Sequence, residues 1–73
     1  MKLDSIKQGK ANSITCDVEN LISENKVSDM ESFLSDISTI LCQFDTDIAI
    51  EVMNNFGDEG EYQARAIKVN YGY

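Results

Sequence analysis

Residues 27–44, VSDMESFLSDISTILCQF, place an apolar side chain at every third or fourth position. These apolar positions are Met30, Phe33, Leu34, Ile37, Ile40, Leu41 and Phe44. On a helix of 3.6 residues per turn they form a single apolar stripe about 100° wide. Ser28 and Glu31 have the spacing of a capping box, which predicts where this helix starts. A helix with so apolar a face must pack on another element, and this requirement constrains the rest of the fold.

The segments on either side of this helix favour strands. In residues 14–18, apolar and polar residues alternate, and this period of two is typical of a half-buried strand. The apolar members are Ile14, Cys16 and Val18. Residues 48–53 are a second apolar run, which predicts a strand with Ile48, Ile50 and Val52 on its inner face. Ala49 and Met53 then belong to the opposite face of the sheet.

The C-terminal part favours a turn over residues 54–60, where Asn and Gly supply positive φ angles. Residues 61–71 predict a last strand. Because its apolar residues change phase, we expect a bulge near Ala66 and Ile67. Residues 20–26 either close the first strand or begin a short helical turn. Residues 1–10 form either a loose arm or a short extra strand.

The predicted fold is therefore a single small α+β domain over residues 1–73. One amphipathic helix packs on a three- or four-stranded, mainly antiparallel sheet. The uncovered sheet face and a free C-terminal strand edge, which ends at Tyr71 and Tyr73, favour a homodimer through edge pairing. The order of elements resembles that of dodecins, which assemble into flavin-binding shells. The resemblance rests on element order alone, and it implies a self-assembling structural or small-ligand-binding module as an alternative function.

Several features argue against catalysis. The chain contains no histidine, which is the commonest general base and metal ligand. Cys16 and Cys42 lie among apolar residues without a CxxC spacing, so we expect free, buried thiols. We therefore expect a non-enzymatic protein with no catalytic residue, cofactor or metal site.

Charge gives the clearest functional signal. Thirteen acidic residues stand against six basic ones, for a net charge of −7, and residues 27–64 hold nine acids and no base. Binding to phosphates requires the opposite sign, so nucleic acids and anionic membranes are disfavoured. A basic partner would be attracted. The alternative is an acidic surface that only keeps the protein soluble.

The leading hypothesis is a small acidic protein-binding module that occupies a basic surface of a partner protein. Size, charge and the lack of catalytic groups suggest inhibitors of the anti-restriction, anti-CRISPR or immunity type, which mobile elements often encode. The expected partner-binding residues are Asp29, Asp36, Asp58, Glu59 and Glu61. Asp29 and Asp36 are seven residues apart and therefore lie on the same side of the predicted helix.

A third hypothesis concerns the last predicted strand, where aromatic and basic residues alternate. These residues are Tyr62, Arg65, Lys68, Tyr71 and Tyr73. This composition is typical of a surface on which bases of a single-stranded nucleic acid stack. The sequence carries no apolar run with the length of a signal peptide or a membrane span, and we expect a cytoplasmic protein.

Overall fold

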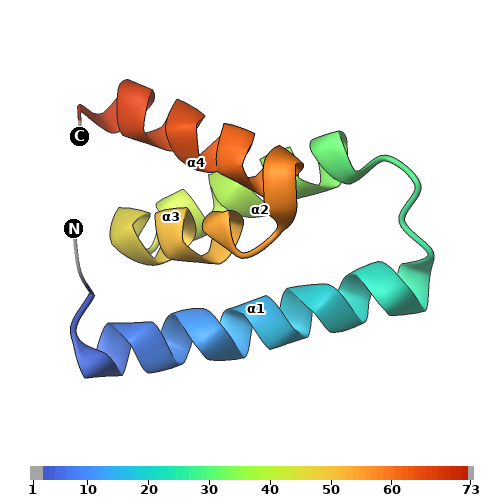
Figure 1. Cartoon of the computed structure of the whole chain (residues 1–73), viewed down its shortest axis with the longest axis horizontal. Coiled ribbons are helices and arrows are strands. Elements are labelled where there is room, and N and C mark those ends of the chain that lie inside the picture. Colours follow the sequence, from blue (N-terminus) through green and yellow to red (C-terminus); the bar gives the residue numbers. More distant parts are fainter. Residues whose placement is uncertain (1–2, 73) are drawn as a thin grey trace.

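The computed structural model describes residues 3–72, and within this range it contains four α-helices and no strand. The helices are α1 (Ser5–Asn25), α2 (Met30–Cys42), α3 (Thr46–Asn54) and α4 (Gly57–Tyr71). They alternate in direction, so that α2 and α4 begin at the end of the molecule where α1 and α3 finish (Figure 1). The predicted α+β fold is therefore wrong. The likeness to dodecins, which depended on the strands, no longer applies.

The central element is α3. It packs against α1, α2 and α4, and α2 and α4 also pack against each other. Among the described helices, α1 approaches the backbone of α3 alone. Four of the nine residues of α3 are buried, whereas only Ala11 and Val18 are buried in the 21 residues of α1. The apolar core therefore lies between α2, α3 and α4, and α1 covers one side of it. The buried apolar residues are Ala11, Val18, Leu34, Ile48, Ala49, Val52, Met53, Ala64 and Ile67.

Three of the four helices begin with an aspartate whose carboxylate accepts a hydrogen bond from a backbone N–H of the first turn. Asp4 accepts from Lys7 at 2.8 Å, and Asp45 accepts from Ile48 at 3.2 Å. In α2 the N-cap is Asp29, which accepts from the Ser32 N–H at 3.1 Å. The helix predicted within residues 27–44 is thus present, but its cap is Asp29 and not the predicted capping box at Ser28.

The segment predicted as the first strand lies inside α1. Ile14 and Val18 are four residues apart, a spacing that fits both a strand of period two and a helix. The deciding positions are Ala11, which is fully buried, and Cys16, which is exposed. The helix puts Cys16 on the side away from α3, so its predicted burial is also wrong. The undecided residues 20–26 complete α1, whose C-cap Lys26 adopts a left-handed φ of 50°.

The second predicted strand is α3. Ile48, Ala49, Val52 and Met53 are all buried, at positions i, i+1, i+4 and i+5 of one helix. Ala49 and Met53, which were expected on an uncovered sheet face, are fully buried. An apolar run this short has no periodicity that separates a strand from a helix packed on several sides.

The predicted last strand and the turn before it form α4. Its buried residues are Gly60, Gln63, Ala64 and Ile67, at positions i, i+3, i+4 and i+7. The phase change that suggested a bulge is the helical period itself. Gly60 is required here because a Cβ atom at this position would overlap the Met53 carbonyl oxygen. Because glycine has no Cβ atom, α4 can approach the end of α3 closely.

Candidate interaction surfaces

Most of the acidic residues lie at helix starts. Three are N-caps and four lie in first turns, where a negative charge is stabilised by unsatisfied N–H groups and by the helix dipole. They are Asp4, Asp29, Glu31, Asp45, Asp47, Asp58 and Glu59. Hydrogen bonds from the Ser32 backbone and side chain lower the pKa of Asp29. The acidic composition thus has a structural explanation in large part, and it includes three of the predicted partner-binding residues.

The other acidic residues lie away from helix starts: Asp17, Glu19, Glu24, Asp36, Glu51 and Glu61. Glu51 accepts a hydrogen bond from Gln8 at 3.4 Å. The remaining five carboxylates form no hydrogen bond or ion pair with a described residue. Glu24 lies in the last turn of α1, where the helix dipole disfavours a negative charge. The sequence interpretation missed the three acidic residues of α1 because it took that segment for a strand and a loop.

The five predicted partner-binding residues do not form one cluster. Asp29, Asp58 and Glu59 lie at the end where α2 and α4 begin (Figure 1). Asp36 is exposed further along α2. Glu61 instead lines a small polar pocket between α3 and α4, described below.

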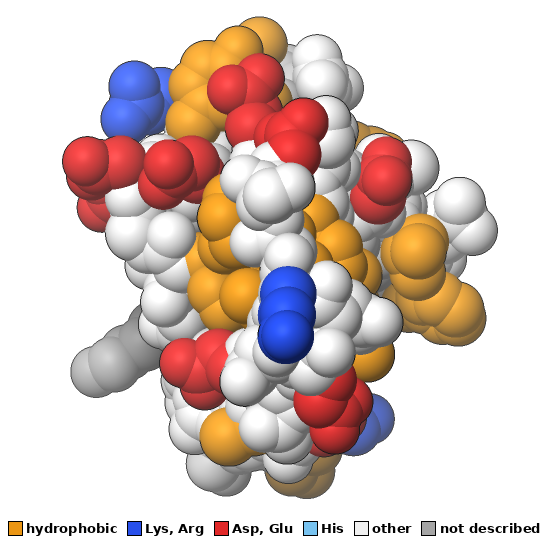
Figure 2. All heavy atoms as spheres, turned by 90° about the vertical axis from the view of Figure 1, so that its right-hand side faces the viewer, with side chains coloured by type: hydrophobic (Ala, Val, Ile, Leu, Met, Phe, Trp, Pro, Cys, Tyr) orange, Lys and Arg blue, Asp and Glu red, His pale blue; other side chains and the backbone are white. Residues whose placement is uncertain are grey.

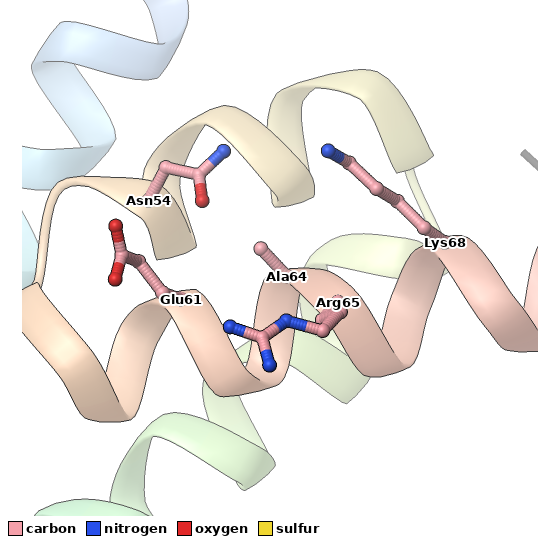
Figure 3. Close-up of a pocket in the computed structure, with 5 residues that line it drawn as sticks. All are labelled: Asn54, Glu61, Ala64, Arg65 and Lys68. Atoms are coloured by element: carbon pink, nitrogen blue, oxygen red, sulfur yellow. The ribbon is translucent and has the colours of Figure 1, made fainter.

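That pocket has a volume of about 180 Å³ and is lined by Asn54, Glu61, Ala64, Arg65 and Lys68. Figure 3 shows Glu61 on the same side of α4 as Arg65, one turn before it, with Asn54 of α3 beside them. Glutamate four residues before arginine is a favourable pairing of charges along a helix. The pocket therefore mixes both signs of charge and offers no simple site for an anion.

The aromatic and basic residues of α4 are separated by the helix. Tyr62 and Tyr71 are nine residues apart, which places them about 180° apart around the helix axis. Tyr62 lines an outer surface of α4 with Arg65 and Val69, whereas Tyr71 lines a groove between α2 and α4 that includes Cys42. Burial raises the pKa of the Cys42 thiol. The predicted edge pairing lacks a strand edge, and Tyr73 lies outside the described residues.

Polar contacts hold α1 along α3. Lys7 Nζ lies 3.0 Å from an Asp45 carboxylate oxygen and 3.7 Å from one of Asp47. Further along, the Asn55 side chain donates a hydrogen bond to the Thr15 hydroxyl at 3.1 Å. The hydrogen bond and charge of Asp45 raise the pKa of Lys7, and the hydrogen bond from Lys7 lowers the pKa of Asp45. These contacts fix the position of α1 relative to the start and the end of α3.

A hollow of about 390 Å³ opens beside these contacts, between α1, the end of α2 and the start of α3. It is lined by Lys10, Ile14, Leu41, Phe44, Asp45 and Ile48. Phe44 is 82% exposed, and Ile40, one turn earlier, is 52% exposed. From the end where α1 finishes, apolar side chains are also visible at the bottom of a recess with acidic side chains around it (Figure 2). The molecule therefore exposes apolar surface close to carboxylates.

Comparison with known protein families, with curated proteins and with solved structures found no match. None of the described helices is both long enough and apolar enough to cross a membrane.

Proposed function

We propose that the protein is a non-enzymatic, acidic helical module that binds a basic surface of a partner protein. The observation that carries this proposal is the set of carboxylates that neither lie at a helix start nor form a hydrogen bond or ion pair with a described residue. They are Asp17, Glu19, Glu24, Asp36 and Glu61. Small size and net charge favour an inhibitor of the anti-restriction, anti-CRISPR or immunity type.

Apart from Glu61, which lies one turn before Arg65, helix stability gives no reason for these charges. Glu24 lies at the unfavourable end of the α1 dipole, and the last turn of α1 contains no basic residue within its bounds. Such carboxylates are exposed and available to a partner. They would speed association with a basic protein, and salt would weaken this effect because charges are screened over about 8 Å at physiological ionic strength.

The competing explanation is that the same charges only keep the protein soluble. A variant with all five neutralised, Asp17→Asn, Glu19→Gln, Glu24→Gln, Asp36→Asn and Glu61→Gln, leaves every helix cap and first turn intact. Circular dichroism should confirm that it folds. We expect the native protein to retain a basic protein from an extract of its own host, and the neutralised variant to lose it.

The retained protein is then purified, and its association rate is measured against ionic strength. A steep fall of the rate with salt for the native chain, and a slow, salt-insensitive rate for the neutralised variant, support the proposal. If both chains retain the same proteins at the same rates, or retain nothing, the acidic surface serves solubility and the proposed function is wrong.

A further inference from the structure

A groove of about 290 Å³ lies between α2 and α4, which pack against each other. Its walls consist of hydroxyl, amide, thiol and apolar side chains, and none of its described lining residues is charged. Charged residues make up 26% of the chain, so an uncharged wall is unusual for this molecule. Ligand pockets usually measure about 300–1,000 Å³, so the α2–α4 groove has room for one small ring system.

Gln63 is the most unusual residue of this groove. Its side chain is only 8% exposed, and it lies on the buried face of α4 with Gly60 and Ile67. Its amide forms no hydrogen bond with a described residue. Among the described residues, every side-chain nitrogen or oxygen that is closed off from solvent has a hydrogen-bond partner. The Gln63 amide is therefore open to the groove that it lines.

The helix packing gives no reason for an amide at this position. A polar group that is buried without a partner is costly, whereas an apolar side chain here would extend the core. The amide of Gln63 offers an acceptor oxygen and N–H donors in one plane. A ligand that presents a donor next to an acceptor would satisfy both ends of the amide at once.

The α2 wall of the groove offers further acceptors. The Ser38 hydroxyl donates a hydrogen bond to the Ser35 carbonyl oxygen at 2.8 Å, and the Thr39 hydroxyl donates to the same oxygen at 3.0 Å. Both hydroxyl protons are thus used within α2, and both oxygens can accept a hydrogen bond from a ligand. On α4, Tyr71 adds an aromatic ring to the lining.

We propose that the α2–α4 groove binds the base of an unphosphorylated purine nucleoside of the adenosine type. Adenine presents its amino donor beside the N7 acceptor, and a glutamine amide forms two hydrogen bonds with this edge. The second amino hydrogen is then available to the Ser38 or Thr39 oxygen. The ring stacks on Tyr71, as bases do on exposed aromatic side chains.

Charge selects a free nucleoside over a phosphorylated one or a nucleic acid strand, which carry the same bases. A phosphate would find no basic partner among the described lining residues, and the net charge of −7 would repel it. The groove is also separate from the proposed acidic binding surface, because none of the five carboxylates named above is among its described lining residues. Failure of either proposal therefore leaves the other standing.

The two cysteines provide the test. Cys42 lines the groove, whereas Cys16 is exposed on α1, so one thiol reports on the groove and the other is an internal control. Alkylation of each thiol by iodoacetamide is followed by mass spectrometry at rising adenosine concentrations. Adenosine at ten times its Kd should slow the reaction of Cys42 by about ten-fold, because only the empty groove exposes this thiol. The Cys16 rate should not change. No slowing at millimolar adenosine, or equal slowing of both thiols, overturns the proposal.

Two substitutions test the residues assigned to the base, with Kd taken from the adenosine concentration at half-maximal protection. Gln63→Leu removes the amide, keeps an apolar group at a buried position and should weaken binding by about ten-fold without lowering the thermal midpoint. Tyr71→Leu should weaken it by a similar factor. The matched control is Tyr62→Leu, on the outer surface of α4, where Tyr62 is 62% exposed against 56% for Tyr71. Unchanged binding by Gln63→Leu, or an equal loss with Tyr62→Leu, contradicts the assignment.

Three other ligands separate the sources of the same chemistry. Inosine, which has a carbonyl acceptor in place of the amino donor, should bind about ten-fold more weakly than adenosine. AMP and a short oligoadenylate should also bind more weakly, because both carry phosphate. Inosine binding as tightly as adenosine would exclude the paired hydrogen bonds to Gln63, and tighter binding of the oligoadenylate would identify a nucleic acid surface. Protection of Cys42 by acetamide but not by adenosine would identify a site for peptide amides, and each of these three results overturns the proposal.

Discussion

Helix α1 and the three-helix unit of α2, α3 and α4 are held in place by different physical means. Every pair of helices within the unit is in contact, and its interior holds fully buried residues such as Leu34, Val52 and Met53. The 21-residue helix α1 lies on α3 alone and buries Ala11 and Val18. The half-buried Ile14 and Ile22 also pack against the core, and polar contacts with α3 involve Lys7, Gln8 and Thr15. The longest helix therefore buries two apolar residues in 21, whereas α3 buries four in nine.

From this difference we expect buried apolar area, and not helix length, to determine how strongly an element is held. Most helical stability in proteins comes from tertiary packing. Exposed hydrogen bonds and ion pairs contribute little because water competes for the same groups. We therefore expect the unit to set the stability of the whole chain and α1 to open at a lower free energy.

The largest effect is expected from Leu34→Ala. Leu34 is fully buried in α2, and replacing a buried leucine by alanine costs about 2–5 kcal/mol. Since small domains have only several kcal/mol of total stability, this variant should be largely unfolded. Thermal and urea unfolding followed by circular dichroism give the measurement. A melt close to that of the native protein would contradict the placement of the core.

Gly60→Ala should give the next largest effect. The added methyl group overlaps the Met53 carbonyl oxygen and lies 2.8 Å from the Phe56 Cβ atom, so α4 must move away from the end of α3. Overpacking of this kind costs about 1–3 kcal/mol. The same denaturant titration measures it. An unchanged or raised midpoint would show that α3 and α4 pack less closely at this point than the structure indicates.

The hydrogen-exchange pattern should separate α1 from the unit. Backbone amides in the second half of α1, near Leu21, should exchange through local opening at a free energy about 1 kcal/mol or more below that of amides near Val52 in α3. Native-state hydrogen exchange with mass-spectrometric or NMR detection measures both. Equal protection in the two regions would show that α1 and the unit unfold together.

Gly9→Ala makes the same substitution as Gly60→Ala at a position where there is space for the added methyl group. Gly9 lies inside α1, and a Cβ atom there would meet no heavy atom within 4 Å. Alanine at an exposed interior position of a helix is more favourable than glycine by about 0.5–1 kcal/mol. The variant should therefore be more stable, or show slower exchange in α1 if only that helix gains. A loss of stability would mean that the outer face of α1 is covered.

The sequence was sufficient to predict the helix that has both a wide apolar stripe and a polar opposite face. That element is α2; of the two aspartates predicted on it, Asp29 is the N-cap and Asp36 is exposed within the helix. It was insufficient for α3 because the segment of residues 48–53 is too short for its apolar pattern to distinguish a helix from a strand.

In α1 few apolar residues mark the helical period, since a helix packed on one neighbour needs few of them. Ile14 and Val18 fit both a strand and a helix, and only the burial of Ala11 and the exposure of Cys16 distinguish the two. Recognition of α1 was also necessary to place the exposed Asp17 and Glu24 on a helix. The aspartates at positions 4, 29 and 45 are a local signal that was available, since each marks a helix start.

The smallest effect is expected from Asp45→Asn, which separates the cap of α3 from the ion pair with α1. Asparagine caps a helix about as well as aspartate, so α3 should keep its start while the attraction of Asp45 to Lys7 is lost.

The folded pKa of Asp45 lies below its ordinary value of 3.8, so the carboxylate stabilises the fold above that pH. This contribution is lost as the pH falls below 3.8 and through the lowered pKa. The native protein should therefore lose some stability in that acidic range that Asp45→Asn does not lose, and high salt should reduce the difference near neutral pH. Unfolding midpoints measured from pH 7 downward test this. An identical pH dependence in both chains would show that the ion pair contributes nothing to holding α1.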